Sequence, residues 1–245
     1  MSTPEIPRLS VVIPAFNEEP RLPATLDKLE QYFARVEYPV EVIVVDDGSS
    51  DGTADLVRAR AGGRMNLQLG QNPGNMGKGV AVRRGMTMAR GQYRLFFDAD
   101  GSTPIEEVEK FYPAFAAGAD VCIGSRALPE SQLVVPQPWH RVLMGRVFNG
   151  MVSTLVVGGF RDTQCGFKGF SARAAELIFP RQQLHGFGFD VELLYIAKTQ
   201  RLTVKEIPVV WIDSPASRVR AFRDARRMFV DLLRIRRHAW RGRYR

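Results

Sequence analysis

Two aspartates one residue apart, Asp98 and Asp100, are the strongest candidates for chemistry in this sequence. They follow the apolar run of residues 93–97, so we expect them at the end of a buried strand. Carboxylates in this spacing can hold a divalent cation while leaving coordination positions open for the oxygens of a diphosphate. Because Asp-rich turns are common, it is the position after a strand that favours metal binding. We therefore predict a metal and diphosphate site here.

Asp47 belongs to a second acidic segment, which follows the β-branched run of residues 40–45. A carboxylate at the end of a strand can accept two hydrogen bonds from a nucleotide, so we predict that Asp47 contacts the ribose or the base. The Ser and Thr residues that come next, in residues 49–53, are typical of a turn and a helix cap.

A glycine-rich segment, residues 74–79, is similar to a phosphate-binding loop but departs from the known motifs. A Walker A motif would need Gly at position 72 and Ser or Thr at position 79, where this chain has Asn72 and Gly79. A GxGxxG motif is absent from the sequence as well. The sequence therefore argues against Walker A chemistry and gives no support to a nicotinamide enzyme.

Short β-branched runs, polar loops and segments with helical apolar spacing alternate through the first 125 residues. We predict strands at residues 9–13, 40–45, 65–69, 94–97 and 121–123. We predict helices at residues 21–33, 53–61, 78–89 and 105–117. Apolar strands that alternate with helices indicate an α/β fold with a parallel sheet covered on both faces. Four polar segments each follow one of the first four strands, so they should meet at one edge of the sheet; they are residues 14–18, 46–49, 74–79 and 98–100.

The pattern is less regular beyond residue 124. Residues 139–157 have helical apolar spacing, which suits a core helix or a helix on a membrane surface. Residues 187–198 and 219–237 are also predicted helices, and residues 203–208 and 209–213 are predicted strands. We expect one domain, residues 8–217, followed by a basic helical extension, residues 218–245.

The positive charge is concentrated in that extension. Residues 218–245 contain 11 Arg and 2 Asp, a formal +9, whereas the whole chain carries +8. The longest apolar stretches, such as residues 151–160, are about half the ~20 residues that a spanning helix needs, so we expect no transmembrane helix. Cys122 and Cys165 lack the spacing of a disulfide framework or a zinc site, which favours a reducing, cytoplasmic setting.

Five segments together resemble the inverting glycosyltransferases of family 2, which have the GT-A fold. They are residues 11–18, 44–53, 75–79, 97–100 and 124–126. Residues 162–168 and 188–194 are similar to the subgroup that makes dolichyl-phosphate glucose, with dolichyl-phosphate mannose synthases as nearer relatives than the processive synthases. The resemblance covers roughly residues 8 to 220. It implies a Rossmann-like, mostly parallel central sheet with helices on both faces, plus the basic amphipathic C-terminal helix.

The resemblance also implies roles for individual residues. Those expected to bind the nucleotide are Pro14, Ala15, Asn17, Glu18, Asp47, Lys78, Asp98 and Ala99. Those expected at the reaction centre are Asp98, Asp100, Arg126, Asp162, Gln164 and Arg218. Asp100 would be the direct ligand of Mg²⁺ or Mn²⁺, between which the sequence does not choose. Members of the mannose branch have Gln as a further ligand where this chain has Ser102.

The chemistry of the acceptor decides whether a catalytic base is needed. A lipid phosphate is already largely dianionic at neutral pH and can attack the anomeric carbon unaided. A hydroxyl acceptor would need a carboxylate base, for which Asp162, Asp190 and Glu192 are the candidates. The alternative for these acids is structural, because acidic residues stabilise a helix N-terminus such as the one predicted near residue 187.

Three functions follow from these patterns. The first is an enzyme held peripherally at the inner face of a membrane, transferring a hexose, with glucose from UDP-glucose favoured, to dolichyl or undecaprenyl phosphate. The second uses a soluble hydroxyl acceptor, or GDP-mannose as donor, and leaves the basic extension for homo-oligomerisation or solubility. The third is a nucleic-acid binder. Two observations argue against the third function: the basic residues are confined to one end of the chain, and the sequence lacks the aromatic motifs of RNA-binding modules.

Overall fold

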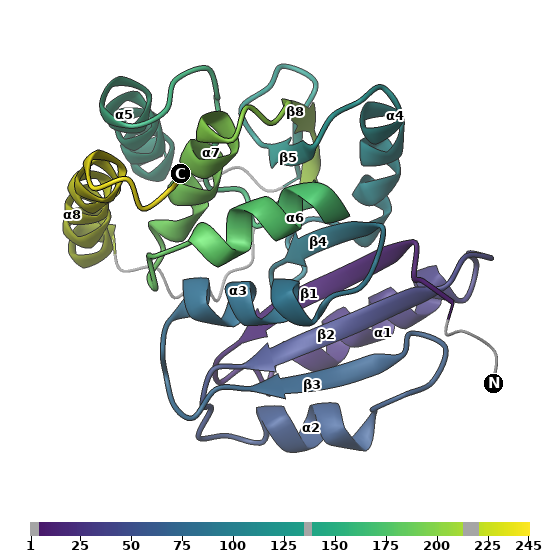
Figure 1. Cartoon of the computed structure of the whole chain (residues 1–245). Coiled ribbons are helices and arrows are strands. Elements are labelled where there is room, and N and C mark those ends of the chain that lie inside the picture. Colours follow the sequence, from purple (N-terminus) through teal and green to yellow (C-terminus); the bar gives the residue numbers. More distant parts are fainter. Residues whose placement is uncertain (1–4, 135–138, 213–220) are drawn as a thin grey trace.

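The computed structural model describes residues 5–134, 139–212 and 221–245 of the chain. Its main sheet has seven strands in the order β3-β2-β1-β4-β7-β5-β8 (Figure 1). The strands are β1 (Leu9–Ala15), β2 (Val40–Asp46), β3 (Leu67–Gln71), β4 (Tyr93–Phe97), β5 (Val121–Ser125), β7 (Phe167–Ser171) and β8 (Val204–Pro208). Two shorter strands, β6 (Gln132–Leu133) and β9 (Val210–Trp211), pair with each other in parallel.

The main sheet is mostly parallel, as the sequence predicts. Strand β1 pairs in parallel with β2 and β4, and β2 pairs in parallel with β3. Strand β7 is the exception, because it lies antiparallel between β4 and β5. The polar segments after β1, β2 and β4 therefore leave the sheet at the same edge.

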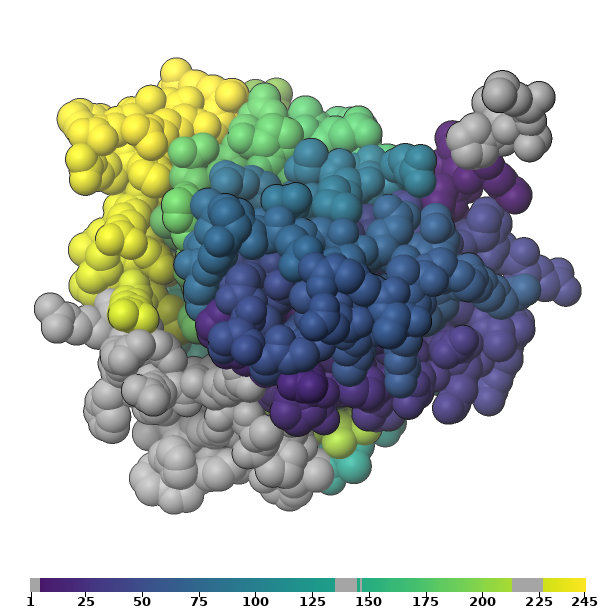
Figure 2. All heavy atoms as spheres, turned by 90° about the horizontal axis from the view of Figure 1, so that it is seen from below, coloured from purple at the N-terminus to yellow at the C-terminus, as the bar shows by residue number. Residues whose placement is uncertain are grey.

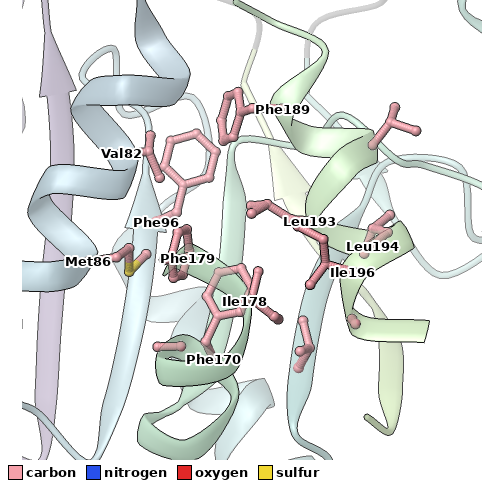
Figure 3. Packing of buried hydrophobic residues seen from close by; sticks show 14 of the residues in the cluster. Val82, Met86, Phe96, Phe170, Ile178, Phe179, Phe189, Leu193, Leu194 and Ile196 are labelled. Carbon is pink, nitrogen blue, oxygen red and sulfur yellow. The ribbon is translucent and has the colours of Figure 1, made fainter. Parts of the chain in front are cut away.

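Helices cover both faces of the sheet, and residues along β1 alternate between two hydrophobic clusters. Val11 and Ile13 belong to one cluster, while Val12 belongs to the other. The first cluster is covered by α1 (Leu22–Phe33), α2 (Thr53–Ala59), the 3-10 helix η1 (Ile105–Lys110) and α4 (Phe111–Ala116). The second is covered by α3 (Lys78–Met88), α6 (Ala172–Ile178), η2 (Phe179–Arg181) and α7 (Phe189–Thr199). In Figure 3, Val82 of α3, Phe96 of β4 and Phe189 of α7 lie next to one another in this second cluster.

Two further helices, α5 (Trp139–Leu155) and α8 (Ala221–Trp240), lie beside α7 at one end of the molecule (Figure 1). Both contribute to the second cluster, through Phe148 and Val152 of α5 and through Leu232 and Ile235 of α8. Figure 2 shows the C-terminal residues (yellow) gathered at this end. The predicted boundary between residues 217 and 218 falls outside the described residues, so the division into domain and extension stays a prediction.

Within residues 5–134, 139–212 and 221–245, no helix has both the length and the apolar character that crossing a bilayer requires.

Candidate active site

A cavity of about 1380 Å³ lies at the carboxyl ends of β1, β2 and β4. Residues that the sequence assigned to the nucleotide and the metal form much of its wall. They are Pro14, Ala15, Glu18, Asp47, Lys78, Asp98, Ala99 and Asp100. Asn17 supports the neighbouring loop, since its backbone N–H donates to Ser49 Oγ (2.8 Å) and its Oδ1 accepts from the N–H of Ser50 (2.8 Å). The structure thus brings the segments after four predicted strands together around one space.

Asp47 shapes the glycine-rich segment at the start of α3. Its side chain is buried, Oδ2 accepts from the N–H of Gly77 (2.7 Å), and Oδ1 accepts from Asn72 Nδ2 (2.7 Å) and from the N–H of Met76 (3.1 Å). Gly77 has a φ of 101°, and a Cβ at this position would lie 2.5 Å from the carbonyl oxygen of His185. Asp47 therefore holds the loop in place, and its predicted contact with ribose or base stays a prediction.

Asp98 forms an ion pair with Lys78, with 2.6 Å between Oδ1 and Nζ. Burial alone would lower the pKa of Lys78, but Asp98, Asp190 and Asp100 outweigh it, so the pKa is raised. Lys78 therefore remains a cation beside the aspartates. The carboxylate of Asp98 also packs against Gly166, where a Cβ would lie 1.9 Å from Oδ2. Only glycine leaves room for Asp98 in this position.

Asp100 presents its carboxylate at the cavity wall, where Oδ1 accepts from the N–H of Ser102 (3.0 Å). Ser102, which differs from the residue of the mannose branch, thus orients Asp100 through its backbone. Within the described part of the chain, no three or more His, Cys, Asp and Glu side chains converge as a complete metal site. Asp100 with Asp98 suits Mg²⁺ or Mn²⁺, which is commonly held by one or two carboxylates together with phosphate oxygens and water.

Arg126 and Asp162 bind each other. Arg126 Nε lies 2.7 Å from Asp162 Oδ2, and Nη2 lies 2.9 Å from Oδ1. Burial would raise the pKa of Asp162, but Arg126 lowers it to about 2. Neither residue lines the cavity, and the Arg126 guanidinium carbon lies 5.6 Å from the centre of the Trp211 ring. The predicted place of Arg126 at the reaction centre stays a prediction.

Of the other residues expected at the reaction centre, Gln164 does not line the cavity but contacts Met228, which does, and Arg218 is outside the described part of the chain. Gln164 donates from its backbone N–H to Asp162 Oδ1 (3.1 Å), and its Nε2 lies 3.9 Å from Met228 Sδ. Arg218 falls within residues 213–220, outside the described residues.

Asp190 and Glu192, the remaining candidate bases, are both buried and engaged in contacts inside the protein. Asp190 Oδ1 lies 2.5 Å from Nζ of the fully buried Lys168. Glu192 accepts hydrogen bonds from the N–H of Leu184 (2.8 Å) and from the hydroxyl of Tyr244 (2.6 Å). Burial raises the pKa of both carboxyls. Neither lines the cavity, so their contacts favour the structural alternative.

Sequence reasoning missed two parts of the cavity wall. One is the segment before α7, whose residues Gln183, Leu184, His185, Gly186 and Phe187 line the cavity. The other is one side of α8, with Arg227, Met228, Val230, Asp231, Arg234, Arg237 and His238. Arg21 also lines it and pairs with Glu18 through two hydrogen bonds. The helical spacing of residues 227, 231, 234 and 238 was the available signal, because such residues share one side of a helix.

Residues 10–178 match the family model described as Glycosyl transferase family 2. The chain belongs to glycosyltransferase family 2. This glycosyltransferase is 37% identical over 245 residues to the human dolichyl-phosphate beta-glucosyltransferase, a match that covers 94% of this chain and 75% of that one. It is 35% identical over 240 residues to the dolichyl-phosphate beta-glucosyltransferase of Dictyostelium discoideum, which covers 93% and 73% of the two chains. The resemblance noted in the sequence is confirmed.

Solved structures confirm the GT-A fold of this glycosyltransferase. The crystal structure of glucosyl-3-phosphoglycerate synthase from Mycobacterium tuberculosis with Mn²⁺ and uridine-diphosphate-glucose matches with a TM-score of 0.69. The two sequences are 21% identical, and the match covers 94% of this chain and 79% of the other. At this identity the match establishes the fold, and it provides a GT-A neighbour that holds a divalent metal.

Proposed function

We propose that this glycosyltransferase transfers glucose from UDP-glucose to a polyprenyl phosphate, dolichyl or undecaprenyl, with inversion at the anomeric carbon. The observation that carries the proposal is the single cavity that contains both the aspartates Asp98 and Asp100 and the arginines of α8. The acidic part suits a metal-bound diphosphate, and the basic part suits an anionic acceptor. The names of the relatives at 35% and 37% identity support the sugar and the lipid acceptor.

The residues of the acidic part would act on the leaving diphosphate. Asp100, with Asp98 next to it, would hold Mg²⁺ or Mn²⁺, and the ion would neutralise negative charge on the departing UDP. Lys78, kept cationic by Asp98, adds a fixed positive charge at the same place. These groups stabilise charge that grows as the bond between the sugar and the diphosphate breaks.

The acceptor phosphate would attack without help from a base. A phosphate monoester has a second pKa near 6, so it is mostly a dianion at neutral pH. This agrees with the positions of Asp162, Asp190 and Glu192, which are engaged in internal contacts and do not line the cavity. A direct displacement by the phosphate oxygen produces the inverted configuration.

We further propose that α8 holds the enzyme on the inner face of a membrane. Its apolar side chains Phe229, Leu233 and Trp240 are exposed, and Trp240 is 89% exposed. Basic residues near an anionic membrane each gain roughly 1 kcal/mol, and exposed apolar side chains add to this. Because Ile235 and Tyr244 are buried in the core, substitution tests the idea better than deletion of the tail. Undiminished binding of Leu233→Ser/Trp240→Ser to vesicles of phosphatidylcholine and phosphatidylserine would refute it.

The transfer itself is tested with purified protein and radiolabelled donors. We expect label from UDP-glucose, added with polyprenyl phosphate and Mg²⁺ or Mn²⁺, to pass into the organic phase, and EDTA to prevent this. Parallel reactions with GDP-mannose and without lipid are the controls. Extraction of label from GDP-mannose alone would overturn the donor, and a water-soluble labelled product alone would favour a hydroxyl acceptor.

A further inference from the structure

The side of α8 that faces the cavity carries positive charge. Arg227, Arg234 and Arg237 line the cavity, together with His238. Residues 227, 234 and 238 are separated by seven and four positions, which places them on one side of a helix. Asp231 is the single acid that the described residues of α8 add to this wall. This wall therefore has a surplus of cations next to a cavity that also holds Asp98 and Asp100.

Arg234 is held in position by a buried carboxylate. Its Nη1 lies 3.0 Å from Oδ1 of Asp231, a residue that is only 6% exposed. Asp231 also packs against Gly188, immediately before α7. A Cβ at Gly188 would lie 2.5 Å from the Cβ of Asp231, so α8 packs closely against this point. Asp231 thus fixes Arg234 relative to α7, and the 60% exposure of the Arg234 side chain leaves other guanidinium N–H groups accessible.

The electrostatic environment of His238 supports the same picture. Its pKa is lowered, first by burial and then by Arg243, Arg237, Arg241 and Arg234. Among the described residues, the hydroxyl of Tyr244 also faces the ring, and its oxygen lies 3.4 Å from His238 Nδ1. The arginines thus favour a neutral imidazole, and an anion near them would gain from the same positive potential.

We propose that Arg234 and Arg237, with Arg227 next to them, bind the phosphate of the acceptor, and that Asp231 is the positioning residue for Arg234. The inference rests on the proposed transfer to a polyprenyl phosphate. A guanidinium group can donate two parallel hydrogen bonds to a phosphate, and it stays charged at any physiological pH. It can therefore hold a phosphate dianion without exchanging a proton with it. In the proposed function, residues of the β1–β4 region serve the donor diphosphate. The arginines of α8 are then available to the second phosphate.

The α8 arginines could bind the phosphate of the acceptor or the phosphates of lipid headgroups, so the test separates the two. Farnesyl phosphate, which is short and water-soluble, serves as acceptor in buffer without detergent or vesicles. The variants are Arg234→Gln, Arg237→Gln and their combination. Arg236→Gln is the matched control, because Arg236 carries the same charge on α8 and is exposed but does not line the cavity.

We expect KM for farnesyl phosphate to rise about 10- to 100-fold in the double variant, the range for losing charge-assisted hydrogen bonds. KM for UDP-glucose should change less than about twofold, and Arg236→Gln should resemble the wild type. Asp231→Asn should raise KM for farnesyl phosphate by a smaller factor, with kcat retained. Equilibrium binding of farnesyl phosphate without donor, followed by calorimetry, should weaken in the same order.

Each other outcome overturns the inference in a distinguishable way. If the wild type transfers glucose and the variants keep its KM for farnesyl phosphate, the arginines do not bind the acceptor, although the proposed function stands. A rise in KM for UDP-glucose instead would assign them to the donor. Loss of binding to phosphatidylserine vesicles with an unchanged KM for farnesyl phosphate would assign them to headgroups. If the wild type does not transfer glucose to farnesyl or polyprenyl phosphate, the proposed function fails together with the inference.

Discussion

The contact between Tyr244, near the C-terminus, and Glu192 of α7 gives a quantitative test of how the end of the chain supports the active site. Tyr244 is 1% exposed, and its hydroxyl donates to Glu192 Oε1 at 2.6 Å. The same carboxylate accepts from the N–H groups of Gln183 (3.0 Å) and Leu184 (2.8 Å), which line the cavity. We expect Tyr244→Phe to keep the packing of the ring and to remove one donor from this buried carboxylate.

The size and pH dependence of the effect follow from these contacts. A hydrogen bond to a charged group contributes about 1.5–3 kcal/mol to stability. For a chain of this length, a loss of about 2 kcal/mol corresponds to a fall in Tm of roughly 4–8 °C. Burial raises the pKa of Glu192, whereas the Tyr244 hydroxyl lowers it, so Tyr244→Phe raises that pKa further. The stability contributed by Glu192 is present below its unfolded pKa of about 4.3 and is lost as pH rises through the folded pKa. The variant should therefore lose more at pH 8 than at pH 5.

Thermal unfolding of both proteins at pH 5 and pH 8 measures this. Tyr195→Phe is the control, because the Tyr195 ring lies 5.6 Å from that of Tyr244 but its hydroxyl has no hydrogen bond within the described part of the chain. Equal falls in Tm for the two variants would refute the role of the hydroxyl. A fall for Tyr244→Phe that is as large at pH 5 as at pH 8 would refute the raised pKa of Glu192 as the source of a pH-dependent effect.

Two further substitutions test the pairing of Asp162 with Arg126 and the position of Asp98. Asp162→Asn should destabilise the protein by about 3 kcal/mol, because it leaves the Arg126 charge without its partner. Since the pKa of Asp162 is lowered to about 2, its stabilisation is present above the unfolded value of about 3.9 and is lost as pH falls toward 2. Urea unfolding should thus show a constant difference from pH 8 to 5, and a difference that shrinks over this range would contradict the pairing. Gly166→Ala would place a Cβ 1.9 Å from Asp98 Oδ2 and should lower kcat/KM at least about tenfold. Gly145→Ala, whose Cβ would have none of the described atoms within 4 Å, should have no effect. Unchanged transfer kinetics in Gly166→Ala would show that the position of Asp98 does not matter.

The first half of the fold could be predicted because its apolar runs are continuous and local. All five strands predicted in the first 125 residues are present, with ends that shift by a few residues. The predicted helix of residues 105–117 divides into η1 and α4. Pro113, near the start of α4, has no N–H with which to continue the hydrogen bonding of a helix from η1.

Strand β7 could not be predicted from its local sequence, because that sequence does not have the apolar pattern of a buried strand. It contains Lys168 and Gly169, which are uncommon inside a central strand. Lys168 is fully buried because its charge pairs with Asp190, which lies 22 positions later in the chain. A Cβ at Gly169 would lie 2.8 Å from the Phe111 ring, so glycine allows α4, which contains Phe111, to pack closely against β7. Both reasons depend on contacts between distant segments.

The acidic part of the site could be predicted for the same reason as the strands that position it. Asp47, Lys78, Asp98 and Asp100 all follow predicted strands or begin a predicted helix. The basic wall from α8 depends instead on where that helix packs. Its helical spacing places the wall residues on one side of the helix, but it does not show which part of the fold that side faces. The ion pair of Arg126 and Asp162 could not be predicted, because nothing in the local sequence indicates that residues 36 positions apart contact each other.

Transfer of glucose by Asp100→Ala tests most directly whether the two aspartates form the metal and diphosphate site of this enzyme. The side chain is only partly buried, and its hydrogen bond from the N–H of Ser102 is lost, so Tm should stay close to that of the wild type. With UDP-glucose, polyprenyl phosphate and saturating Mg²⁺ or Mn²⁺, we expect organic-extractable product to fall by several orders of magnitude. Transfer within about tenfold of the wild type, by a folded protein, would contradict the assignment of Asp100 as the metal ligand.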